Sequence, residues 1–151
     1  MEKIEITEDK TNELIEGFKK LRSTGIAFLI IGVIGPIIAV ISTIFGDNFA
    51  INLTIPPLAG FIGIGGVFIF QSNTAIKKVM EKDFQAFKTK CIRKRLGDYA
   101  VVENNEELSK KVKKATKWVA IVGPTKLINA DDEIGIVKVD KKLFYAFPLE
   151  A

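Results

Sequence analysis

The sequence contains no histidine and a single cysteine, Cys91. Without histidine it lacks the commonest general base and the commonest metal ligand of proteins. One cysteine excludes an internal disulfide. No arrangement of serine, lysine or carboxylates indicates a nucleophile beside its base. We therefore predict a protein that is not an enzyme, with no catalytic residue, no metal site, no cofactor and no small-molecule substrate.

Charge is also missing from the middle of the chain. Between Arg22 and Lys77 the only charged side chain is Asp47, which separates two long apolar runs. A helix needs about 20 apolar residues to cross a bilayer core of about 30 Å, and each run is longer than that. The sequence predicts a membrane α-helical hairpin with transmembrane helices at about residues 24–46 and 57–76.

Basic residues are unevenly placed around this hairpin. The connection after Asp47 holds no lysine or arginine, whereas residues 77–95 carry a net charge of +6. By the positive-inside rule, this predicts a multi-pass protein of the cell membrane with both termini cytoplasmic. We expect the basic side chains to set this topology and to attract anionic lipid headgroups. This basic belt comprises Lys77, Lys78, Lys82, Lys88, Lys90, Arg93, Lys94 and Arg95.

Small residues recur along both predicted spans at intervals of three, four or seven. In lipid, helices associate through close backbone approach across small residues, so these stripes predict helix-packing faces. The pattern does not distinguish packing within one hairpin from packing between copies. The stripes are Gly25, Gly32, Gly35, Ala39, Ser42 and Gly46 in the first span, and Ala59, Gly63 and Gly66 in the second.

Prolines and one asparagine add detail to the spans. Pro36 predicts a kink in the first helix, because it cannot donate a backbone hydrogen bond. Pro56 and Pro57 fit the first turn of the second helix. Asn73 fits the membrane interface or, alternatively, a hydrogen bond across a helix–helix contact.

Two further helical segments are predicted outside the hairpin. Leu14 and Phe18 belong to an apolar face at helical spacing, which favours a juxtamembrane amphipathic helix within residues 1–22. After the second span, apolar residues recur at intervals of four, three and four and predict that the helix continues as a long cytoplasmic extension over residues 77–96. This stripe, which needs a partner, consists of Met80, Phe84, Phe87 and Cys91. We predict that Cys91 is buried and structural.

The last segment, residues 97–151, changes rhythm and predicts a small C-terminal α+β domain. Asn104 and Asn105 are typical of a turn and a helix N-cap, followed by a short helix over residues 106–117. Alternating apolar residues bounded by Gly, Pro and Asp predict strands. These are residues 99–103, 118–122, 125–128, 134–139 and 143–147.

Together these segments predict a non-enzymatic integral membrane protein. We expect it to act as a membrane-anchored interaction or accessory subunit, binding a protein partner or its own copies through the cytoplasmic helix and the α+β domain. The alternative is a homo-oligomeric pore or transporter element built from the hairpin, although neither span carries the ionisable residue that usually marks a path. Nucleic-acid binding is not expected, because no aromatic stacking pattern accompanies the charge.

Overall fold

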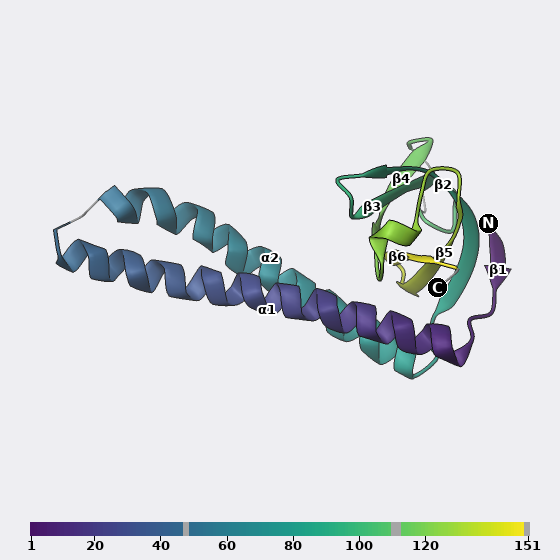
Figure 1. Ribbon diagram of the computed structural model, residues 1–151, viewed down its shortest axis with the longest axis horizontal. Coiled ribbons are helices and arrows are strands. Elements are labelled where there is room, and N and C mark those ends of the chain that lie inside the picture. Colours follow the sequence, from purple (N-terminus) through teal and green to yellow (C-terminus); the bar gives the residue numbers. More distant parts are fainter. Residues whose placement is uncertain (47–48, 110–112, 150–151) are drawn as a thin grey trace. The chain divides into compact units, whose positions relative to one another are not determined.

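The structure, a computed structural model, describes residues 1–46, 49–109 and 113–149 (Figure 1). Its residues fall into two compact units: Lys19–Asn73, here called the hairpin, and Met1–Phe18 with Thr74–Ala151, here called the barrel domain. The elements in chain order are β1 (Glu2–Ile4), α1 (Glu8–Ile44), α2 (Phe49–Met80), β2 (Gln85–Arg95), β3 (Tyr99–Glu103), β4 (Thr116–Ile121), the 3₁₀ helix η1 (Thr125–Leu127), β5 (Glu133–Asp140) and β6 (Leu143–Pro148).

The two long apolar helices are confirmed. Helix α1 continues through Pro36 and ends shortly before Gly46, whose φ of +97° is readily adopted only by glycine. Helix α2 begins at Phe49, so Pro56 and Pro57 lie inside it and not in its first turn as predicted. Proline has a helical φ but no amide hydrogen, so α2 continues here without the two hydrogen bonds that residues 56 and 57 would otherwise donate. Asp47 lies outside the described residues.

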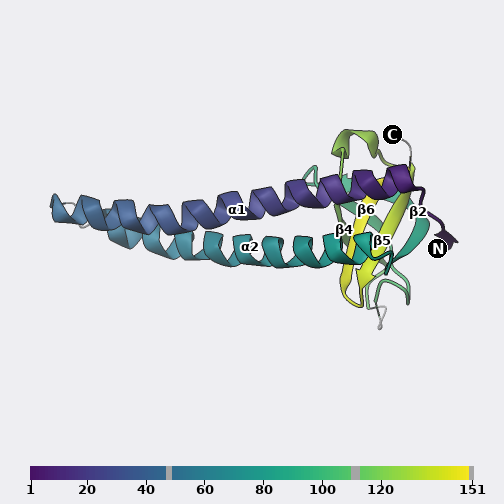
Figure 2. The same cartoon turned by 90° about the horizontal axis from the view of Figure 1, so that it is seen from below.

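The barrel domain is built on a closed ring of five strands, in the order β2-β3-β4-β6-β5 and back to β2. Its pairs are antiparallel except β4 with β6, which are parallel. The first half of β2 pairs with β5 on one edge and β1 on the other, and its second half pairs with β3. This order, with a parallel pair between the third and fifth barrel strands, is that of the Greek-key barrel of the OB type. Figure 2 shows the strands from below.

Alternating side chains of the strands fill the barrel interior. In β3, for example, Ala100 and Val102 point inward and are fully buried, as the two-residue period of a strand requires. In β5, Gly135 stands opposite Phe147 of β6, and the Phe147 ring occupies the space that a side chain at position 135 would need. The core cluster consists of Cys91, Ala100, Val102, Leu108, Val119, Ile128, Ile134, Ile136, Phe144 and Ala146.

The start of α1 packs on this barrel. Phe18 is fully buried, and its ring meets the Tyr145 ring edge to face at 4.8 Å between centroids. A Cβ atom on Gly17 would lie 2.6 Å from a methyl carbon of Val122, so the backbone here lies directly against the barrel. Leu14 is also buried. The helix predicted within residues 1–22 is confirmed from Glu8 onward, and the barrel covers its apolar face.

The predicted cytoplasmic helical extension over residues 77–96 is wrong. Helix α2 ends at Met80 in a Schellman motif, in which the amide of Asp83 donates to the carbonyl of Lys78 at 2.9 Å and the amide of Lys82 donates to that of Val79 at 3.1 Å. The left-handed position of this motif is usually glycine, but here it is Lys82, with φ of +55°. The sequence therefore carries no conventional stop signal where the helix ends.

The predicted α+β domain is mostly strands. Strands β3, β4, β5 and β6 confirm the predicted strands 99–103, 118–122, 134–139 and 143–147. The predicted helix over residues 106–117 is wrong: the Asn105 side chain accepts hydrogen bonds from the amides of Glu107 and Leu108, but β4 already begins at Thr116. Residues 110–112 lie outside the described part. The predicted strand 125–128 is the 3₁₀ helix η1.

Candidate interaction surfaces

The hairpin helices meet through glycine. A Cβ atom on Gly65 would lie 2.6 Å from the carbonyl oxygen of Gly25, and one on Gly25 would lie 2.8 Å from the Cβ of Phe68. Neither site has room for a methyl group, so the two backbones are in direct contact. The Phe28 ring stacks on Phe61 at 5.3 Å between centroids. This is the close approach across small residues that stabilises helix pairs in lipid.

The predicted packing stripe of the first span coincides with this inner face. Gly25, Gly32 and Ala39, each seven residues apart, are buried, and Gly35 and Ser42 are half-buried. Gly46 is exposed with no atom near its would-be Cβ, and its position marks the end of the helix.

The stripe predicted for the second span does not line the contact within this hairpin, and packing between copies stays a prediction. Ala59, Gly63 and Gly66 are exposed, and nothing lies within 4 Å of a Cβ built on either glycine. The contact is made by Gly65, which lies on another face of the helix. Ser72, one of the described buried residues of α2, donates its hydroxyl to the carbonyl of Phe68 at 2.5 Å, so it adds no bond between helices.

One polar contact joins the two helices. The guanidinium of Arg22 donates to the side-chain oxygen of Asn73 at 3.3 Å. Of the two interpretations of Asn73, the hydrogen bond across a helix–helix contact is therefore present, with an arginine as its donor.

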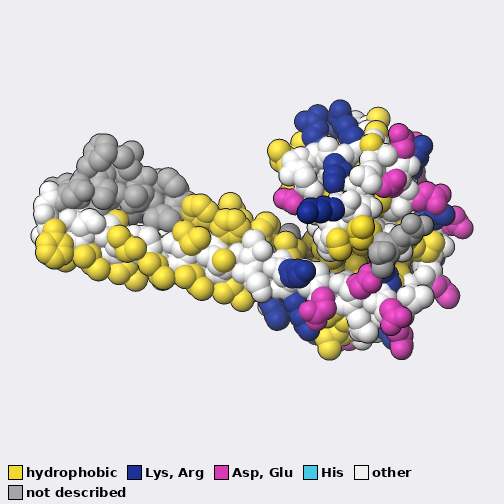
Figure 3. Space-filling view, in the orientation of Figure 1, with side chains coloured by type: hydrophobic (Ala, Val, Ile, Leu, Met, Phe, Trp, Pro, Cys, Tyr) yellow, Lys and Arg dark blue, Asp and Glu magenta, His cyan; other side chains and the backbone are white. Residues whose placement is uncertain are grey.

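The outer surface of the hairpin is apolar (Figure 3). Both helices are long and apolar enough to cross a membrane by length and composition, and only 17% of each apolar window is buried inside the molecule. Isoleucine and valine dominate the exposed positions, most of them about half exposed. They include Ile26, Ile30, Ile31, Val33, Ile34, Ile37, Ile38, Val40, Ile41, Ile44, Ile62, Ile64 and Val67.

The basic belt is not a single surface, because most of it lies on strand β2 and not on a helix. Four of its lysines form ion pairs: Lys78 with Asp83 at 2.6 Å, Lys82 with Glu8 at 3.9 Å, Lys88 with Glu133 at 2.7 Å and Lys90 with Asp131 at 3.2 Å. The Lys94 ammonium donates to the carbonyl of Thr125 at 2.8 Å. The acidic partners of Lys78 and Lys88 raise the pKa of both ammonium groups. Within the described residues, Lys77, Arg93 and Arg95 carry belt charge without an ion-pair partner.

The residues of the predicted partner stripe do not share one surface. Met80 is exposed at the end of α2, Phe84 lies in the following turn and is half-buried, and Phe87 and Cys91 point into the barrel domain from β2. A spacing of four fits the period of a strand as well as that of a helix. Cys91 is fully buried in the core, as predicted for a structural cysteine, and burial raises the pKa of its thiol. The neighbouring basic residues do not activate it.

Three strands bring together a surface that the sequence did not reveal. Trp118 of β4 is 47% exposed, the Arg95 guanidinium of β2 lies 5.1 Å above its ring, and Tyr99 of β3 lies 6.3 Å away between ring centroids. At the turn between β2 and β3, Leu96 is 81% exposed. The available signal was the alternation of side chains in β3 and β4. It places Trp118 on the opposite side of its strand from the buried Val119.

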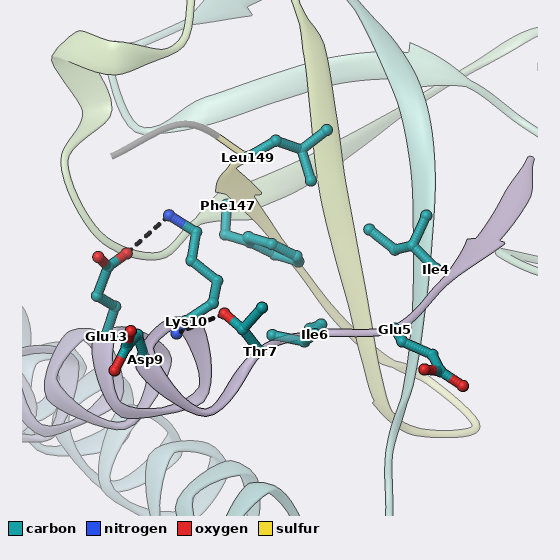
Figure 4. A pocket seen from close by; sticks show the side chains of 9 residues that line it. All are labelled: Ile4, Glu5, Ile6, Thr7, Asp9, Lys10, Glu13, Phe147 and Leu149. Carbon is teal, nitrogen blue, oxygen red and sulfur yellow. Dashed lines mark hydrogen bonds and ion pairs between the residues drawn. The ribbon is translucent and has the colours of Figure 1, made fainter.

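A pocket of about 280 Å³ opens between the start of α1 and the end of β6 (Figure 4). Its floor is apolar, and its rim carries the carboxylates of Glu5, Asp9 and Glu13. The rim ammonium, Lys10, already forms an ion pair with Glu13 at 2.7 Å. Such a rim disfavours an anionic ligand. The floor residues are Ile4, Ile6, Phe147 and Leu149.

The chain matches no protein-family model, no curated protein and no solved structure. Across the described ranges, no three His, Cys, Asp or Glu side chains gather as a metal site would require. A shared strand order indicates a fold and not a function, so the function must be argued from the surfaces themselves.

Proposed function

We propose that this chain is an integral membrane protein of two spans that anchors a non-enzymatic barrel domain as an interaction or accessory subunit at the cytoplasmic face of the cell membrane. The observation that carries the proposal is the outer surface of the hairpin. Soluble proteins rarely expose contiguous apolar patches of more than a few hundred Å². Here exposed isoleucines and valines run along α1 from Ile26 to Ile44. Lipid is the solvent in which such a surface is stable.

The hairpin is a poor candidate for the core of a soluble protein. A core helix would be mostly buried, whereas each apolar window of these helices is only 17% buried. The closest contacts between the helices use glycine backbones, which suits lipid, where the hydrophobic effect does not hold helices together.

The orientation rests on the flanking charges. Lys19, Lys20 and Arg22 precede the first apolar run and Lys77 follows the second, whereas the connection at Asp47 has no basic residue. The positive-inside rule then places both termini and the barrel domain in the cytoplasm. Because residues 85–95 form a strand, the surface offered to a protein partner belongs to the barrel domain and not to an exposed helix.

Cysteine labelling tests this topology. In a Cys91→Ala background, a membrane-impermeant maleimide applied to intact cells should label Asp47→Cys, in the connection between the two predicted spans. Lys142→Cys, on an exposed barrel turn, should label only after permeabilisation. Fractionation should place both variants in the membrane pellet after alkaline extraction. A soluble protein, or the reverse labelling pattern, would contradict the proposal.

Cross-linking tests the interaction role. In cells, cross-linkers should trap the barrel domain against a second protein or a second copy. A protein that is monomeric in mild detergent and forms no cross-linked product in cells would exclude this part of the proposal while leaving the topology standing.

A further inference from the structure

One end of the barrel carries an exposed surface that is both apolar and basic. Its residues come from β2, the turn after it, and β4: Ile92, Arg93, Arg95, Leu96 and Trp118, here called the tryptophan face. The strand register joins them, because Arg93 pairs with Val101 in β3 and Val101 pairs with Trp118 in β4. Val101, which lies between Arg93 and Trp118 in this register, is only 1% exposed.

A bulge in β2 widens the apolar part of this face. Cys91 pairs with Val102, and Arg93 pairs with Val101, which adjoins Val102 in β3. Ile92 is therefore the extra residue of the bulge. Ile92 is 44% exposed, whereas its neighbour Cys91 is fully buried. Bulges often redirect side chains next to functional sites.

Leu96 is unusual in both its exposure and its backbone conformation. It is 81% exposed and has φ of +54°, a conformation that favours glycine or asparagine. Neither packing nor backbone geometry therefore accounts for leucine at the tip of a turn. An exposed, strained residue of this kind points to a role outside folding.

The charge of the face is positive. Arg93 and Arg95 have no acidic partner in the described part of the chain, and the nearby acid in the same turn is Asp98. The Arg95 guanidinium lies 5.1 Å over the Trp118 ring, which leaves its donors free to bind an anion. Arginine recognises phosphate groups with paired hydrogen bonds.

We propose that the tryptophan face binds the headgroup region of an anionic lipid bilayer. Leu96 and Ile92 enter the interface, Trp118 lies at headgroup level, and Arg93 and Arg95 bind lipid phosphates. Tryptophan beside exposed leucine and arginine is the composition typical of membrane interfaces. A nucleic acid fits less well, since the exposed aliphatic side chains offer a base nothing to stack on and Arg95 covers one side of the indole.

This inference rests on the proposed function only for the presence of the bilayer, and one experiment separates the two. Trp118 is the only tryptophan of the chain, so its fluorescence reports on this face alone. The full-length protein is reconstituted into vesicles of phosphatidylcholine, with or without phosphatidylserine, and its incorporation is measured by flotation. Incorporation tests the membrane protein, and Trp118 emission tests the face.

In vesicles that contain phosphatidylserine, Trp118 emission should shift to shorter wavelength, and lipids brominated near the headgroup should quench it. In phosphatidylcholine alone both effects should be smaller. Arg93→Gln and Leu96→Ser leave the Arg95–Trp118 contact in place, and each should reduce the quenching. For the arginine, the ratio of docked to undocked protein should fall about fivefold.

The matched control is Lys3→Gln, which removes one exposed positive charge from β1. Lys3 lies opposite Phe87 in the first half of β2, whereas Arg93 lies in the second half of that strand. The control should quench like the unmodified protein. A loss equal to that of Arg93→Gln would mean that net charge, and not this face, binds lipid.

Two results would overturn the inference. The first is normal flotation with Trp118 emission that is the same in detergent, neutral vesicles and anionic vesicles. The second is quenching of Trp118 by a single-stranded RNA oligonucleotide at physiological salt without any response to phosphatidylserine, which would assign the face to nucleic acid.

Discussion

The hairpin and the barrel domain use apolar residues in opposite ways. In the hairpin, Gly25, Gly32, Ala39 and Gly65 are buried, and most of the described isoleucines and valines are exposed. In the barrel domain, isoleucine, valine and phenylalanine fill the interior, and lysine, arginine and glutamate cover the surface. The barrel is held by removing apolar area from water. In the bilayer that we propose for it, the hairpin gains nothing from that effect and depends on close contact between its helices.

A charge placed on the outer surface of each unit should give the largest difference between the two units, because lipid tolerates it far less well than water. Ile34 in the hairpin and Leu127 in the barrel domain are 48% and 46% exposed. Ile34→Lys should disfavour membrane insertion by about 3 kcal/mol, measured as loss from the membrane pellet after alkaline extraction. Leu127→Lys should change stability by less than about 0.5 kcal/mol. Equal, small effects of the two variants would refute the lipid-facing assignment.

A methyl group inside the hairpin should have the next largest effect. Gly65→Ala places a Cβ atom 2.6 Å from the carbonyl oxygen of Gly25, so the helices must separate. We expect a loss of about 1–3 kcal/mol, measured by thermal unfolding in detergent. Gly63→Ala meets no atom within 4 Å and should be neutral or stabilising by about 0.5–1 kcal/mol.

The Gly63 control also tests the remaining question about the small-residue stripes. If the exposed stripe of Ala59, Gly63 and Gly66 joins copies of the chain, Gly63→Ala should change the oligomeric mass in detergent. An unchanged mass would restrict helix packing to the contact inside one hairpin.

A buried hydroxyl in the barrel domain predicts a pH effect. The Tyr145 side chain is buried beside Phe18, and its hydroxyl has no hydrogen-bond partner among the described residues. Burial raises the pKa of Tyr145 to about 12. The folded state therefore holds this proton more tightly than the unfolded state, and the associated stability is complete below pH 10 and is lost between about pH 10 and 12.

Tyr145→Phe removes this titration. Between pH 9 and 12 the unmodified protein should lose about 2 kcal/mol more than the variant, measured by thermal unfolding of the strand signal at each pH. At neutral pH the variant should be equally stable or up to about 1 kcal/mol more stable, because an unpaired hydroxyl leaves the core. Parallel pH curves for the two proteins would contradict this.

What the sequence could predict depended on how local each signal is. The helices follow from the scarcity of charge between Arg22 and Lys77, and strands such as β3 follow from alternation within a few residues. Strand β2 was missed because the left-handed residue after helix α2 is Lys82 and not glycine, and because the spacing of Phe87 and Cys91 fits a helix as well as a strand. Local pattern alone does not separate these cases.

The surfaces were harder because they depend on pairing between distant segments. The sequence does not show which of Gly63, Gly65 and Gly66 contacts the other helix. Only the way the two helices cross determines that Gly65 does so. Likewise, Trp118 meets Arg95 only through the registers of β2, β3 and β4. The basic belt was evident from the sequence, but its ion pairs with Glu133 and Asp131 were not. These acids come much later in the sequence and approach the lysines only because the barrel closes.

The smallest predicted effect concerns Leu96, an apolar side chain of the barrel domain that is exposed as those on the outside of the hairpin are. Asparagine tolerates φ of +54° better than leucine, so Leu96→Asn should stabilise the barrel domain by about 0.5–1 kcal/mol, measured by thermal unfolding in neutral detergent. The same variant should lose quenching by brominated anionic lipid. Leucine here would then be retained at a cost in stability for contact with lipid, whereas a destabilised Leu96→Asn would mean that the leucine side chain supports the fold.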